Sequence, residues 1–139
     1  MPQNLGFDVE LPVPFKDGVE RVKEALKQEG FGILTEIDLQ ATFREKLGRE
    51  FRPYVILGAC NPPLAFSAIN ADSAVGLLLP CNVTVESVDE KRTSVQLTNP
   101  EALLSTAAGA SPSLAAVARD ASERMARVTD TLKRTSGAG

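Results

Sequence analysis

Two Cys-Asn segments, Cys60-Asn61 and Cys81-Asn82, hold the side chains of this sequence that are best suited to chemistry. A cysteine thiolate is both a nucleophile and a soft metal ligand. The sequence around Cys60 predicts the end of a strand and the start of a helix, where unpaired backbone N–H groups and the positive end of the helix dipole favour the thiolate. We therefore expect Cys60 to become more acidic, by less than about one pKa unit.

Two asparagines and a glycine complete the candidate site. Asn61 precedes Pro62-Pro63, a pattern typical of a helix N-cap, so its side chain either caps the helix or orients a ligand. Asn82 can likewise contact a ligand or stabilise a bulge or turn. Backbone amides of the turn 58–61 can bind a small anion, although the turn has neither a Walker lysine nor a three-glycine pattern. The candidate ligand-binding residues are Gly58, Cys60, Asn61, Cys81 and Asn82.

The two cysteines also have a structural interpretation, because free Cys is among the most buried residue types. If their sulfurs are adjacent, Cys60 can act as an attacking thiol and Cys81 as its resolving partner in redox or sulfur-transfer chemistry. Two thiolates do not complete a tetrahedral zinc site, whereas four thiolates across a dimer axis would. We assign no metal site within one chain, and the cofactor and any catalytic role stay open.

Composition narrows the function classes. The chain has 139 residues, of which 43% are hydrophobic, and it contains no His, which excludes His-dependent catalytic pairs and imidazole metal ligation. The net charge of −3 gives no support for binding to nucleic acid or anionic lipid. No apolar run is long enough for a membrane span, and residues 1–10 lack the features of a secretion signal. We expect a cytoplasmic protein with reduced thiols.

The hydrophobic pattern predicts one domain over residues 1–139 with a frayed tail at 135–139. We expect strands at 7–11, 31–39, 54–60, 77–85 and 92–97, the fourth with Pro80 at an edge position or a bulge. Helices are expected from Phe15 to a stop at Gly30, at 40–47, at 62–71, from Pro100 through Leu104, and over about 23 residues from Pro112 with Ser111 as cap. In the helix at 62–71, the predicted buried face is Leu64, Ala65, Ala68 and Ile69.

These elements favour an α+β fold with two layers. A mainly antiparallel sheet of about five strands, in the order β-α-β-β-β-β-α with short intervening helices, would be covered by the long C-terminal helix. A parallel doubly wound sheet is the alternative. If the third and fourth strands are antiparallel neighbours, Cys60 and Cys81 lie at the same end of the sheet. Glu36 and Asp38 lie on one face of the second predicted strand. They are either paired carboxylates or residues that face water.

The segments 54–65 and 76–83, which contain both Cys-Asn pairs, resemble the bacterial and archaeal family called domain of unknown function 302. The resemblance extends upstream through Gly32–Asp38 and the Lys46-Leu47-Gly48 turn, and downstream to the closing helix. It implies a compact α/β domain in small cytoplasmic proteins that are often dimeric, with no settled biochemical activity. A family match of this kind transfers a fold and not a function.

Three functions remain in competition. The first is a small cytoplasmic domain, expected to be a homodimer, that binds a small ligand or a metal at the end of the sheet lined by Cys60, Asn61 and Cys81. The second is thiol redox or sulfur-transfer chemistry, for which no base is identified. The third is a protein-interaction module that docks a partner on the outer sheet face or on the long helix between Leu114 and Leu132, with both Cys structural.

Overall fold

A computed structural model describes residues 5–108 and 112–137. Its strands are β1 (Gly6–Leu11), β2 (Gly32–Asp38), β3 (Tyr54–Cys60), β4 (Cys81–Asp89) and β5 (Arg92–Thr98). They form one sheet in the order β1-β5-β4-β3-β2, in which every neighbouring pair is antiparallel. The predicted α+β fold is therefore confirmed, and the parallel alternative is wrong.

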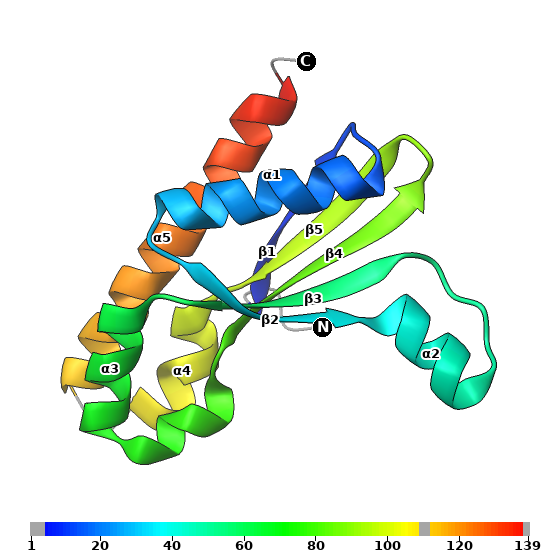
Figure 1. Cartoon of the computed structure of the whole chain (residues 1–139). Helices are drawn as coiled ribbons and strands as arrows, with labels where there is room; N and C mark the ends of the chain where they lie inside the picture. Colours follow the sequence, from blue (N-terminus) through cyan, green and yellow to red (C-terminus); the bar gives the residue numbers. More distant parts are fainter. Residues whose placement is uncertain (1–4, 109–111, 138–139) are drawn as a thin grey trace.

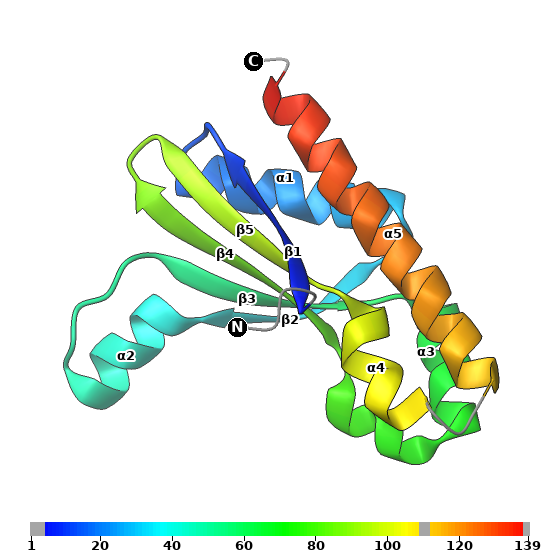
Figure 2. The ribbon, with the colours of Figure 1, turned by 180° about the vertical axis from the view of Figure 1, so that it is seen from behind.

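The helices are α1 (Phe15–Gln28), α2 (Leu39–Leu47), α3 (Pro62–Ala71), α4 (Pro100–Ala108) and α5 (Pro112–Gly137), with a 3-10 helix η1 (Ser73–Leu78) after α3. Helices α1 and α5 pack on the same face of the sheet, while α3 and α4 lie together at one end of it (Figure 1). Figure 2, from behind, shows α5 running along β1.

The core lies between the sheet and the apolar stripes of α1 and α5. Val22 and Leu26 of α1 and Met125 and Val128 of α5 are completely buried against inward-facing strand residues. Each such side chain stabilises the fold by roughly 1.5–3 kcal/mol relative to exposure. The apolar face of α5 is thus used within the chain.

Helix α1 ends where the sequence predicts. Gly30 adopts φ +84°, which a residue with a side chain rarely adopts, and its N–H donates to the carbonyl oxygen of Lys27. The N–H of Phe31 donates to the carbonyl oxygen of Leu26, which completes a Schellman motif. This stop directs the chain into β2, antiparallel to β3.

A second, smaller core closes the end of the sheet near α3 and α4. Its buried residues come from α3, η1, α4 and the start of α5: Ala68, Val75, Leu104, Leu114 and Ala118. This cluster and the sheet end bound the candidate site.

The predicted strand at 77–85 is wrong in its first part. The leucines at 77 and 78 belong to η1, and Leu77 is 89% exposed. Strand β4 begins only at Cys81 and is central in the sheet, so Pro80 occupies neither an edge position nor a bulge; it precedes the strand, after a cis peptide bond. A proline there removes no hydrogen bond from the ladder.

Three smaller differences concern the helices. Ile69 is 44% exposed, so the buried face of α3 is narrower than expected. Helix α4 continues to Ala108, beyond the predicted Leu104. Helix α5 continues to Gly137, three residues beyond the predicted length of about 23; the predicted cap Ser111 and residues 138–139 of the predicted tail lie outside the described residues.

Candidate functional site

The corner between β3 and α3 is built around Asn61. Its Oδ1 accepts a hydrogen bond from the backbone N–H of Leu64 at 3.2 Å, which confirms the predicted N-cap. Its Nδ2 donates to the carbonyl oxygen of Glu29, at 3.4 Å. The side chain is buried and engaged at both ends, so it holds the corner against the end of α1.

The register of β3 and β4 brings the two cysteines to one end of the sheet. Ala59 lies opposite Cys81, and Cys60 is the next residue along β3. Both are free thiols, with Cys60 partly exposed and Cys81 buried. The prediction that a separation of 21 positions in the sequence hides spatial proximity is confirmed.

Burial, and not the helix dipole, governs the acidity of these thiols. It raises the pKa of Cys60. Burial also raises the pKa of Cys81 to about 11, and the nearby Cys60 contributes in the same direction. The expectation of a more acidic Cys60 is therefore wrong, and both side chains are neutral thiols at pH 7.

The start of α3 explains why the dipole argument fails. Pro62 and Pro63 have no N–H, and the N–H of Leu64 already donates to Asn61. The N–H of Ala65 donates to the carbonyl oxygen of the same cap residue, at 2.9 Å. The amides that usually stabilise a thiolate at a helix N-terminus are thus missing or occupied.

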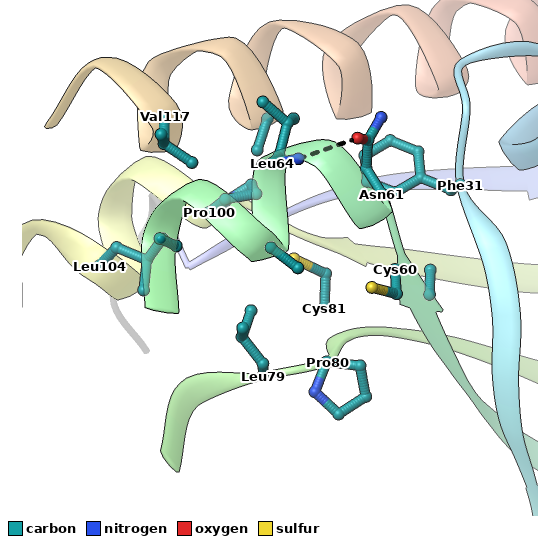
Figure 3. Close-up of a pocket in the computed structure, with 14 residues that line it drawn as sticks. Phe31, Cys60, Asn61, Leu64, Leu79, Pro80, Cys81, Pro100, Leu104 and Val117 are labelled. Atoms are coloured by element: carbon teal, nitrogen blue, oxygen red, sulfur yellow. Dashed lines mark hydrogen bonds between the residues drawn. The ribbon is translucent and has the colours of Figure 1, made fainter. Parts of the chain in front are cut away.

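Both cysteines and Asn61 line one small pocket, the Cys60–Cys81 pocket (Figure 3). Its free volume is about 30 Å³, room for one or two water-sized groups. The described lining comes from the residue before β2, the end of β3, the start of β4 with the two residues before it, and from α3, α4 and α5: Phe31, Ala59, Cys60, Asn61, Leu64, Ala65, Ala68, Leu79, Pro80, Cys81, Pro100, Leu104, Val117 and Ala121.

The chemistry of this lining is apolar. Its described residues include no charged side chain, and apart from Asn61 and the two thiols they are hydrocarbon or proline. Sequence reasoning missed the contributions of Leu104 and Val117, whose only signal was membership of the apolar faces of α4 and α5. The arrangement accommodates a neutral apolar group better than the small anion considered for the turn at 58–61.

Gly58 and Asn82 are not among the described lining residues, although each is next to one in the sequence. They pair with each other across β3 and β4. A side chain at position 58 would collide with Thr35 and come within 2.8 Å of Pro80, so the glycine serves close packing. Asn82 is exposed, and its carbonyl oxygen accepts from the Thr98 hydroxyl at 2.6 Å. The structure thus brings together three of the five predicted site residues.

Two further observations concern ligands and membranes. Within residues 5–108 and 112–137, no three His, Cys, Asp or Glu side chains are grouped so that they could hold a metal ion. In the same part of the chain, none of the helices combines the length and apolar character needed to cross a bilayer.

Comparison with known proteins identifies the family. No curated protein matches the chain significantly. A crystal structure of an uncharacterized conserved DUF302 protein from Bacillus stearothermophilus is similar, with 32% sequence identity and a TM-score of 0.79 over 91% of this chain and 96% of that one. The family model described as domain of unknown function DUF302 matches residues 7–132. The chain, with its antiparallel sheet and its apolar pocket between two cysteines, therefore belongs to the DUF302 family.

Proposed function

We propose that this protein binds the apolar end of a small neutral ligand in the Cys60–Cys81 pocket. The supporting observation is that segments distant in the sequence converge on one small, partly open pocket with a nearly all-apolar lining. Ligand sites of this kind are mostly apolar with a few polar groups that fix orientation. Here the two neutral thiols are the polarizable part of the wall.

The free volume limits what enters. About 30 Å³ accepts a methyl or a short alkyl end but not a whole organic molecule, so the rest of the ligand lies at the mouth of the pocket. Each methylene that leaves water contributes about 0.8 kcal/mol, or about a fourfold gain in affinity. Affinity should therefore increase with chain length and then level off once the pocket is full.

A series of linear primary alcohols from ethanol to hexanol tests this function. We expect saturable NMR shift changes at Cys60, Cys81 and Leu104, with affinity rising along the series before it levels off. Ala65→Leu fills the pocket and should abolish the response. Ala71→Leu is the matched control, because Ala71 lies at the exposed end of the same helix and is not among the described lining residues. Absence of saturable shifts, or equal responses in both variants, would contradict the proposal.

Thiol redox or sulfur-transfer chemistry has weaker support. Attack requires the thiolate, and the pKa of both Cys60 and Cys81 is raised. A metal site built from these thiols would need ligands from a second chain. Metal content measured on the purified protein distinguishes such a metal site from the binding of a neutral ligand.

Exposed apolar side chains favour a second function, an interaction module that associates with another copy of the chain. Phe66 and Leu77, on α3 and η1, are 72% and 89% exposed. Such residues mark association surfaces when they gather in one place. Light scattering should give about twice the chain mass of 14.8 kDa. Leu77→Glu should restore the monomer, whereas Leu34→Glu, at an exposed position on β2, should not.

A further inference from the structure

A second and larger hollow lies on the helix-covered side of the sheet, between α1 and the strands β2 and β3. We name it the α1–β2 groove; its volume is about 400 Å³, in the range of small-molecule sites. In Figure 1, α1 and β2 lie close together at the short turn that joins them, and they move apart toward the side where α2 lies. The described lining residues are Phe15, Lys16, Val19, Glu20, Lys23, Glu36, Asp38, Gln40, Pro53, Tyr54 and Val55.

One ion pair bridges the two walls of this groove. Nζ of Lys23 lies 2.8 Å from Oε1 of Glu36, and the hydrogen bond between them raises the pKa of Lys23. This contact links α1 to the middle of β2. The pair neutralises one lysine and one carboxylate of the lining, and Glu20 also attracts Lys23, as the smallest of the causes that raise its pKa.

The remaining charges of the lining are not balanced. Glu20 lies one helical turn before Lys23 on α1, and Asp38 lies two residues beyond Glu36 on the same face of β2. One Asp38 oxygen caps α2 by accepting from the N–H of Ala41, at 2.9 Å. Neither Glu20 nor Asp38 forms an ion pair with a described residue, whereas Lys16 contributes a single opposing charge, so the groove has an excess of one negative charge.

Below these charges the groove has an apolar floor. Phe15, Val19 and Val55 contribute to its lining, and Val19 and Val55 belong to the main core. A ligand that fits must therefore combine one positive charge with an apolar body. We propose that the α1–β2 groove binds a small amphipathic amine, with the ammonium group directed to Glu20 and Asp38 and the apolar body on the floor.

This site is separate from the Cys60–Cys81 pocket, because none of the described lining residues is shared. The proposal therefore stands or fails independently of the proposed function. Since both carboxylates are exposed, each contributes a weak and salt-dependent attraction. We expect millimolar binding, for which NMR titration is the appropriate method.

Phenethylamine is the probe, and phenethyl alcohol is its neutral control. The amine should shift the amide signals of residues 15–23 and 36–40 in a saturable manner, and the alcohol should bind several-fold more weakly. Glu20→Gln and Asp38→Asn should each weaken amine binding by about two- to fivefold, and asparagine preserves the cap of α2. Glu24→Gln, on α1 but not among the described lining residues of the groove, should leave binding unchanged.

A variant that strengthens binding separates this mechanism from structural damage. Lys23→Gln removes the partner of Glu36 and releases a third carboxylate, so the amine should bind more tightly. Equal binding of amine and alcohol, binding that neither Glu20→Gln nor Asp38→Asn weakens, or unchanged affinity in Lys23→Gln would overturn the proposal.

Discussion

Asn61 and Glu29 lie 32 positions apart, yet the side-chain amide of Asn61 donates a hydrogen bond to the carbonyl oxygen of Glu29. Nη1 of Arg124, in α5, donates to the same carbonyl oxygen at 3.0 Å. The end of α1 is thereby tied both to the corner that leads into α3 and to α5. One buried polar side chain thus caps one helix and satisfies a carbonyl at the end of another.

Asn61→Ala removes the cap of α3 and the bond to Glu29 together. We expect the free energy of unfolding to fall by about 1–3 kcal/mol. Asn61→Ser retains a capping oxygen but is too short to reach the carbonyl of Glu29, so it should cost less. Urea denaturation of the three proteins measures both effects. If Asn61→Ala were as stable as the wild type, the corner would not depend on this side chain.

Gly30→Ala tests the turn that follows α1. A Cβ at position 30 would lie 2.9 Å from Nδ2 of Asn61, on a residue whose φ is +84°. Gly48 has φ +63° with open space around the same position, so Gly48→Ala isolates the backbone strain, about 1 kcal/mol. Gly30→Ala should be clearly more destabilising in the same urea titration. Equal losses in the two variants would mean that the contact with Asn61 relaxes without cost.

Local signals in the sequence predicted much of the fold. The stop at Gly30, the cap at Asn61 and the alternation of Thr93, Val95 and Leu97 are each set by residues within a few positions of one another, and the structure has all three. The three leucines at 77–79 were predicted to begin a strand, but strand β4 begins only at Cys81. A short apolar run fits a buried strand and other conformations equally well, and Leu77 faces solvent.

The candidate site was only partly predictable for a different reason. Strand pairing brought Cys60 and Cys81 together, as the sequence order suggested, but the pocket wall from α4 and α5 depends on packing between distant segments. The sequence does contain the reason why the start of α3 does not make Cys60 more acidic. Pro62 and Pro63 donate no hydrogen bond, so the predicted helix start was never able to offer its first amides to a thiolate.

Thiol reactivity in the native protein should reflect this environment. With single-thiol variants Cys60→Ser and Cys81→Ser, we expect slow alkylation by iodoacetamide at pH 7, because both thiols are protonated. Cys60, which is partly exposed, should react faster than buried Cys81. Its rate should increase only as pH approaches its raised pKa. Rapid reaction of Cys60 at pH 7, with an apparent pKa below about 8.5, would instead support the redox alternative.

The buried thiol of Cys81 also makes stability depend on pH. Its pKa is about 11 in the folded protein, where burial and, to a smaller extent, Cys60 disfavour the thiolate. In the unfolded chain the thiol ionises near pH 8.5–9. Between these values the folded state retains a proton that the unfolded state has lost, so the free energy of unfolding falls as pH rises. The contribution of Cys81 is fully present below about pH 8.5 and declines by up to about 3 kcal/mol by pH 11.

Cys81→Ala isolates this contribution, because every other titratable group is common to the two proteins. The variant should be less stable at pH 7, since it loses a buried sulfur, but its stability should fall less steeply above pH 9. The two curves of unfolding free energy against pH should therefore converge. The Cys60→Ser variant should retain most of the fall in unfolding free energy with pH, because burial is the larger cause of the raised pKa of Cys81. Parallel curves for the wild type and Cys81→Ala would show that this thiol reaches water in the folded state, and that the Cys60–Cys81 pocket is open enough to solvate it.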